Sequence, residues 1–200
     1  CDCFAGACPS YGQDTVICPG GFWGYRHALG MPLSVVGAPD VTPEIAYANA
    51  PEMAVCVWAG RDFTMRPTHE QRLQALALLG WHHAVHRGDV LRLLGSTSPH
   101  VIYFYCHGGV KRNGMPFLQV GTDPEGGRIV RSNLRSKGIR WGTRPGEPRP
   151  LVFINGCHTT ALEPEQALDF VSALVENSAA AGVIGTEITV FEPLATAFAE

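Results

Sequence analysis

A histidine and a cysteine that stand 50 positions apart, His107 and Cys157, each come just beyond an apolar run of this 200-residue chain. A cysteine thiol has a pKa of about 8.5, so it becomes a strong nucleophile near neutral pH only when a neighbouring base takes its proton. An imidazole can take that proton and later return it to a leaving amine. The pair predicts a hydrolase that forms a thioester on Cys157, with His107 as its base and acid.

Glycines adjoin both candidate residues. Gly108 and Gly109 follow His107, and Gly156 precedes Cys157. A backbone N–H without a neighbouring side chain can approach a developing oxyanion closely, and glycine also permits the sharp turn that would expose the sulfur. We predict an oxyanion hole formed by the N–H groups of Gly108 and Cys157, with Gly109 as a further donor.

The elements that must position these residues follow from the hydrophobic pattern. Strands are expected at residues 53–58, 82–86, 101–106, 117–120, 151–154 and 182–186, and helices at 68–80, 89–95, 132–137, 166–179 and from 192 onward. Because the main strands are apolar throughout, they are typical of a parallel sheet with helices on both sides. The predicted fold is therefore α/β, a three-layer αβα sandwich with a mostly parallel sheet. If the strands before His107 and Cys157 are neighbours, both side chains reach the same edge of the sheet.

Composition excludes several classes of protein. The chain is 46% hydrophobic and 16% charged with a net charge of −3, which argues against disorder and against nucleic acid as the main ligand. No apolar run approaches the roughly 20 residues that a membrane span requires. The seven cysteines are an odd number without a regular pairing pattern, which favours free thiols in a reducing, cytoplasmic compartment.

Residues 1–48 are irregular and rich in Cys, Gly and Pro, and we expect the folded domain to span residues 49–200. The chain begins without Met and ends inside a helix pattern, so the sequence is interpreted as a C-terminally truncated piece of a longer polypeptide. Residues 108–150 form a long connection, and such loops are usually functional. We place a processing switch there as a hypothesis, because basic residues make it a target for basic-specific proteases.

Other polar residues are weaker candidates. Glu187 ends the last strand near the same sheet edge and is our candidate for a substrate pocket that selects a basic side chain; Asp62, Asp123 and Glu163 lie in loops and are lesser ones. His158 is expected to point away from its neighbour Cys157, and Cys106 to face the core. The spacing of the first four cysteines only approaches that of a zinc site, and three close histidines at 82, 83 and 86 lack further ligands. No metal or cofactor is predicted.

Three stretches resemble the CHAT family of caspase-like domains. They are residues 102–108 (IYFYCHG), 151–159 (LVFINGCHT) and 181–187 (AGVIGTE), followed by a helix pattern at 193–198. The spacing of the histidine and cysteine also matches that of caspases, although Asn155-Gly156 replaces their Gln-Ala. The resemblance implies a caspase/hemoglobinase-like fold, a His107–Cys157 peptidase dyad, a protein substrate and fused or associated regulatory domains. It also implies a role in bacterial signalling, defence or regulated cell death.

Two other functions stay open at this point. The same fold can serve as a catalytically silent interaction or scaffold module, and a thiol hydrolase can act on small amides instead of peptides. Fast alkylation of Cys157 would distinguish an enzyme from a scaffold, and an open groove would distinguish a peptidase from an enzyme with a closed small-molecule pocket.

Overall fold

A five-stranded parallel sheet forms the centre of the computed structural model, which describes residues 49–75, 80–123, 126–156, 171–185 and 192–199. The strand order is β2-β1-β3-β7-β8, and each neighbouring pair runs parallel. The strands are β1 (Glu52–Val57), β2 (Gly80–Ala84), β3 (Val101–Tyr105), β7 (Leu151–Asn155) and β8 (Gly182–Ile184). The apolar sequences of β1, β3 and β7 fit burial on both faces.

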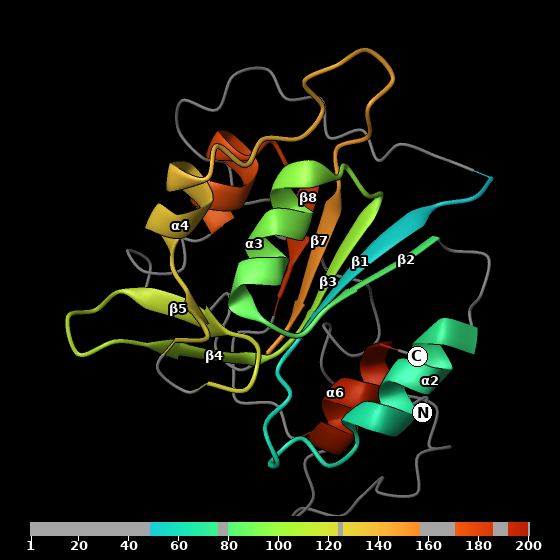
Figure 1. The fold of residues 1–200 in the computed structure, drawn as a ribbon, viewed down its shortest axis with the longest axis vertical. Helices are drawn as coiled ribbons and strands as arrows, with labels where there is room; N and C mark the ends of the chain where they lie inside the picture. The colour runs from blue at the N-terminus through green and yellow to red at the C-terminus, as the bar shows by residue number, and fades with distance from the viewer. Residues whose placement is uncertain (1–48, 76–79, 124–125, 157–170, 186–191, 200) are drawn as a thin grey trace, which may run out of the picture. The chain divides into compact units, whose positions relative to one another are not determined.

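Helices cover both faces of this sheet (Figure 1). On one face pack α2 (Arg66–Ala75) and α6 (Glu192–Ala199); on the other pack α3 (Arg87–Ser96), α4 (Arg131–Ser136) and the π-helix η2 (Ala173–Asn177). Alternate strand residues divide between the two cores: Ile102 and Phe104 face α3, whereas Tyr103 and Tyr105 face α2 and α6. The predicted three-layer α/β fold is confirmed.

The connections place a topological switch point between β1 and β3. From β1 the chain passes to β2 on one side, and from β2 it crosses back to β3 on the other side of β1. In open α/β sheets, ligands bind beyond the carboxyl ends of the strands that flank such a point. The loops that follow Val57 and Tyr105 are therefore the first places to look for a site.

A small antiparallel sheet follows β3 directly. It consists of β4 (His107–Val110), β5 (Pro116–Gln119) and β6 (Arg128–Ile129). Only β5 corresponds to a strand expected from the sequence; Gly108 and Gly109 lie in β4, where we expected a loop. Two consecutive glycines have a low strand propensity, so pairing with β5 outweighs the local preference here.

Two helix predictions need correction. Helix α2 begins at Arg66 instead of Thr68, and Gly80, expected as its stop, is the first residue of β2. The start shifts because the Glu192 carboxylate, from α6, accepts hydrogen bonds from the N–H groups of Thr64 and Met65. This tertiary contact satisfies N–H groups ahead of the helix, and no pattern near Thr68 in the sequence indicates it. Helix α6 itself begins at Glu192, as predicted.

Buried polar side chains connect the sheet to the helices on the face with α2 and α6. The Asn155 amide donates to the Tyr103 hydroxyl at 2.8 Å and to the Ala195 carbonyl at 2.7 Å. The Tyr103 hydroxyl also lies 2.8 Å from Nε2 of His69, which is fully buried. Because buried polar groups are costly when unsatisfied, this network holds the end of β7 against α6 and α2.

Replacing Asn155 with alanine should therefore destabilise the protein. The Tyr103 hydroxyl and the Ala195 carbonyl would each lose a buried donor, so we expect the free energy of unfolding to fall by about 1–3 kcal/mol in urea denaturation. Asn113→Ala is the control, because Asn113 is exposed in a turn and its loss should cost less than about 0.5 kcal/mol. Equal stability of the two variants would contradict this interpretation of the network.

Candidate functional site

The ends of β3 and β7 lie side by side, which meets the condition that the sequence set for a shared site. Tyr105 pairs with Asn155 in parallel register, and the N–H of Cys106 donates to the Asn155 carbonyl at 3.3 Å. His107 follows Tyr105, the last residue of β3, by two positions. Gly156 follows Asn155, the last residue of β7, and is the last described residue before Cys157. Cys157 and Glu187 lie outside the described residues, as do His158 and Glu163, so their places in the site stay predictions.

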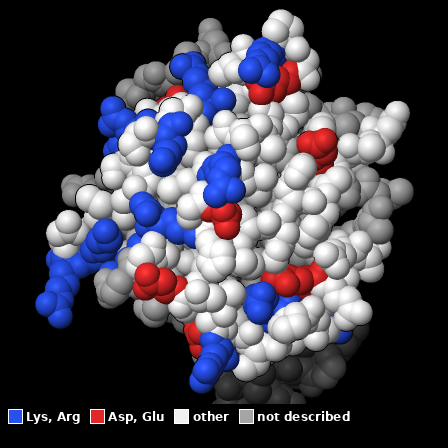
Figure 2. All heavy atoms as spheres, viewed as in Figure 1, with Lys and Arg blue, Asp and Glu red and all other residues white. Residues whose placement is uncertain are grey.

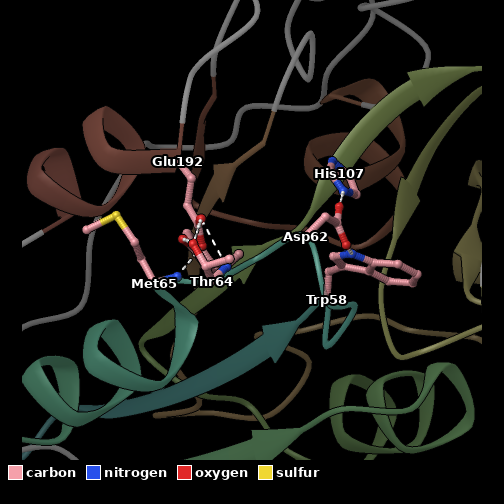
Figure 3. A network of polar contacts seen from close by, with 7 residues as sticks. Trp58, Asp62, Thr64, Met65, His107 and Glu192 are labelled. Atoms are coloured by element: carbon pink, nitrogen blue, oxygen red, sulfur yellow. Dashed lines mark hydrogen bonds and ion pairs between the residues drawn. The ribbon is translucent and has the colours of Figure 1, made fainter.

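The His107 ring is held by a carboxylate from the loop after β1. Its Nε2 lies 2.5 Å from Oδ2 of Asp62, while Oδ1 of Asp62 accepts the indole N–H of Trp58 at 2.8 Å. Figure 3 shows Asp62 between the two rings, with one oxygen toward each. The three residues come from the C-terminal side of the two strands that flank the switch point, so the sheet topology brings them together.

Aromatic rings line two sides of the imidazole. The ring centroid of Phe63 lies 4.7 Å from that of His107 in an edge-on arrangement, and the ring of Trp58 lies 5.8 Å away. The loop can pass this close to the indole because position 60 is glycine: a Cβ there would lie 2.3 Å from Nε1 of Trp58 and 2.5 Å from Oδ1 of Asp62. The side chain of His107 nevertheless keeps 38% of its surface exposed, which leaves it accessible to a reacting partner.

The ionisation of Asp62 reflects these contacts. Partial burial by itself raises the pKa of the carboxyl, but the hydrogen bonds from Trp58 and His107 stabilise the charged form and together lower the pKa of Asp62 below its usual range. Asp62 is thus a carboxylate throughout the neutral pH range. A negative charge therefore stands next to the ring that we predict to act as the base.

The backbone of β4 separates the roles of its two glycines. The N–H of Lys111 donates to the Met115 carbonyl, and Val110 faces Pro116, which has no N–H. Because paired and unpaired positions alternate along an antiparallel ladder, the N–H of Gly109 faces β5 and that of Gly108 points away from it. A Cβ at Gly109 would lie 2.8 Å from the Phe117 ring, so this glycine serves packing. The predicted oxyanion donor, Gly108, is the one whose N–H is directed out of the ladder.

Glu192 fixes the loop that carries Asp62. Its carboxylate accepts the N–H and hydroxyl of Thr64, at 3.0 and 3.1 Å, and the N–H of Met65 at 2.8 Å (Figure 3). It also accepts the hydroxyl of Tyr105 at 3.1 Å. Burial, together with the charge of Glu192, raises the pKa of Tyr105, so this hydroxyl remains a donor. The C-terminal helix therefore supports the site through the loop and through the end of β3.

The structure also shows where two other candidates, Cys106 and Asp123, lie in the fold. Cys106 is buried in the core cluster below α3, as predicted, and Cys56 is fully buried, which raises the pKa of its thiol. Asp123 lies in the connection between β5 and β6. Within the described ranges, no group of three or more His, Cys, Asp or Glu residues could hold a metal ion. None of the helices that the structure describes is long and apolar enough to cross a membrane.

Positive charge is concentrated in the connection between β3 and β7. Nine of the fifteen Lys and Arg residues fall between positions 108 and 150, against three acidic residues. Figure 2 shows several blue side chains on the left of the view, where Figure 1 has the β4–β5 hairpin and α4. Although the net charge of the whole chain is slightly negative, the connection between β3 and β7 is basic, and it begins with the strand that contains His107.

Comparison with known proteins gives one informative relative. The chain is 47% identical over 206 residues to a protein named as a probable protease from Vitiosangium sp. (strain GDMCC 1.1324). The alignment covers 98% of this chain and 26% of that protein, so the chain spans about a quarter of the relative's length. No protein-family model matches the chain. This chain is therefore similar to part of a protein that is named as a probable protease.

The pairing of Asp62 with His107 was not predicted from the sequence, in which Asp62 was only a lesser candidate for the substrate pocket. The signal was available, since Asp62 follows the carboxyl end of β1 by a few residues, as His107 follows that of β3. What the pattern did not contain was the order of the strands, which makes β1 and β3 neighbours.

Proposed function

We propose that this protein is a cysteine endopeptidase of the caspase-like CHAT type, with Cys157 as nucleophile and His107 as general base and acid. The observation that carries the proposal is the parallel register of β3 and β7, which leads the chain toward His107 and toward Cys157 at one edge of the sheet. The 47% identity to a probable protease supports the reaction class. A protein substrate and a cytoplasmic role in bacterial signalling, defence or regulated cell death belong to the same proposal.

The reaction follows from the chemistry of these groups. His107 takes the proton of the Cys157 thiol, and the thiolate attacks the carbonyl carbon of the scissile peptide bond. The negative charge that develops on the carbonyl oxygen is stabilised by the N–H of Gly108 and the N–H of Cys157. His107 then gives its proton to the leaving amine, and water hydrolyses the thioester with the same imidazole as base. Glu187 is retained as the residue that would select a basic side chain next to the cleaved bond.

A single labelling experiment separates this enzyme from a silent scaffold. We expect iodoacetamide to label Cys157 at least about tenfold faster than Cys56 and Cys106, with labelling read at each cysteine by peptide mass spectrometry. Cys56 and Cys106 are the internal controls, because both are buried and the pKa of the Cys56 thiol is raised by that burial. His107→Ala should slow the labelling of Cys157 alone. Equally slow labelling of all three cysteines would favour the scaffold.

A further inference from the structure

We propose that Asp62 is a positioning residue that holds the neutral His107 ring with its proton on Nε2, so that Nδ1 is the nitrogen that serves Cys157. The catalytic purpose of this arrangement rests on the proposed function. The arrangement itself rests on the contact of His107 Nε2 with Asp62 Oδ2 at 2.5 Å.

The choice of nitrogen follows from what each group can donate or accept. A carboxylate carries no proton to give, so the ring nitrogen that faces Asp62 must be the one with the hydrogen. The other nitrogen of a neutral imidazole is then an acceptor, as a base for a thiol must be. When the ring has taken the thiol proton, the adjacent carboxylate also compensates its positive charge. This one contact thus fixes the orientation of the His107 ring, sets its tautomer and stabilises its protonated form.

The two oxygens of Asp62 are both engaged by internal donors. Oδ1 accepts the indole N–H of Trp58, a residue only 5% exposed that can donate and cannot accept, and Oδ2 accepts from His107. A substrate guanidinium that bound Asp62 through both oxygens would have to share each oxygen with one of these donors. The geometry therefore favours a positioning role over the pocket role that the sequence left open for Asp62.

The surroundings keep this carboxylate in place. Trp58 extends β1 by one residue through a bridge to Gly121. The backbone N–H of Trp58 donates to the Tyr105 carbonyl at 2.8 Å. Beyond Asp62, the loop is held by Phe63, which packs against His107 and Tyr105. The carboxylate is consequently fixed from both sides in the chain, as a positioning residue requires.

Trp58 makes the Asp62→Asn variant a sharp test. Because the indole N–H of Trp58 can only donate, it should bind the carbonyl oxygen of the new asparagine side chain. The NH₂ group of that side chain then points toward His107. Nε2 then has to accept, and the proton moves to Nδ1, the nitrogen that the thiol needs. We expect kcat/KM to fall by about 10²–10⁴-fold with little change in Tm, as expected for an imidazole held in the wrong tautomer. Adding Trp58→Phe frees the amide to present its oxygen to His107 and should restore part of the activity.

The tautomer of His107 can be measured by a method that does not depend on enzymatic activity. In a Cys157→Ala background, ¹⁵N NMR of the neutral His107 ring should show the proton on Nε2, and on Nδ1 after Asp62→Asn. Asp89→Asn is the matched control, since Asp89 is a half-exposed carboxylate paired with Arg92 on α3 and should change neither spectrum nor activity. A ring whose proton stays on the same nitrogen in both backgrounds overturns the positioning role. Undiminished proteolysis by Cys157→Ala overturns the proposed function instead, whatever the spectrum shows.

Discussion

Proteolysis by this protein is expected to disappear when Cys157 is replaced with alanine. The variant keeps His107, Asp62 and the N–H of Gly108, but it has no atom that can form the acyl intermediate, so no remaining group replaces the lost step. We expect a loss of at least about 10³-fold in kcat/KM, in line with the removal of a nucleophile from other hydrolases. The measurement is the appearance of new N-termini in an amine-blocked peptide library, followed by mass spectrometry.

Two controls make that result specific. Cys56→Ala removes a thiol from the buried interior of β1 and should retain cleavage, because this sulfur has no access to substrate. The Tm of Cys157→Ala should stay close to that of the unchanged protein, which excludes unfolding as the cause. Cleavage by Cys157→Ala at the same sites and at a similar rate would contradict the cysteine mechanism.

The second large effect is expected for Glu192→Ala at the start of α6. This carboxylate accepts from the N–H and hydroxyl of Thr64, from the N–H of Met65 and from the hydroxyl of Tyr105, so its removal leaves four groups without their charged acceptor. Hydrogen bonds to charged groups contribute about 1.5–3 kcal/mol, and we expect a loss of that size in the free energy of unfolding. Activity should fall as well, because Asp62 lies two residues before Thr64 and depends on this loop.

Graded variants separate stability from activity. Glu192→Gln keeps an acceptor oxygen but loses the charge, so its stability and activity should lie between those of the alanine variant and the unchanged protein. Glu52→Ala is the control, because Glu52 is an exposed carboxylate at the start of β1, away from the carboxyl ends of the strands. Urea denaturation and peptide cleavage should be measured on the same samples. An alanine variant with unchanged stability would show that the loop is held without Glu192.

Much of the fold was predictable because the main strands are continuous apolar runs. The expected strands at 53–58, 101–106 and 151–154 coincide with β1, β3 and β7 to within a residue or two, since burial on both faces leaves a strong pattern. Among the features that escaped prediction are β4 and the true start of α2. Both depend on distant partners, β5 for the glycines of β4 and Glu192 for the N–H groups ahead of α2.

The sequence by itself determined the α/β class and the choice of His107 and Cys157 as chemically capable residues just beyond the ends of strands. These conclusions rest on local patterns and on a topological rule that holds for most parallel sheets. Only the tertiary structure decided that Asp62 holds the His107 ring, that Trp58 holds Asp62, and that the N–H of Gly108 and not Gly109 points out of the ladder. The physical reason is that hydrogen bonds need a definite distance and direction, and between residues 45 positions apart these are set by strand order and loop packing, which no local pattern encodes.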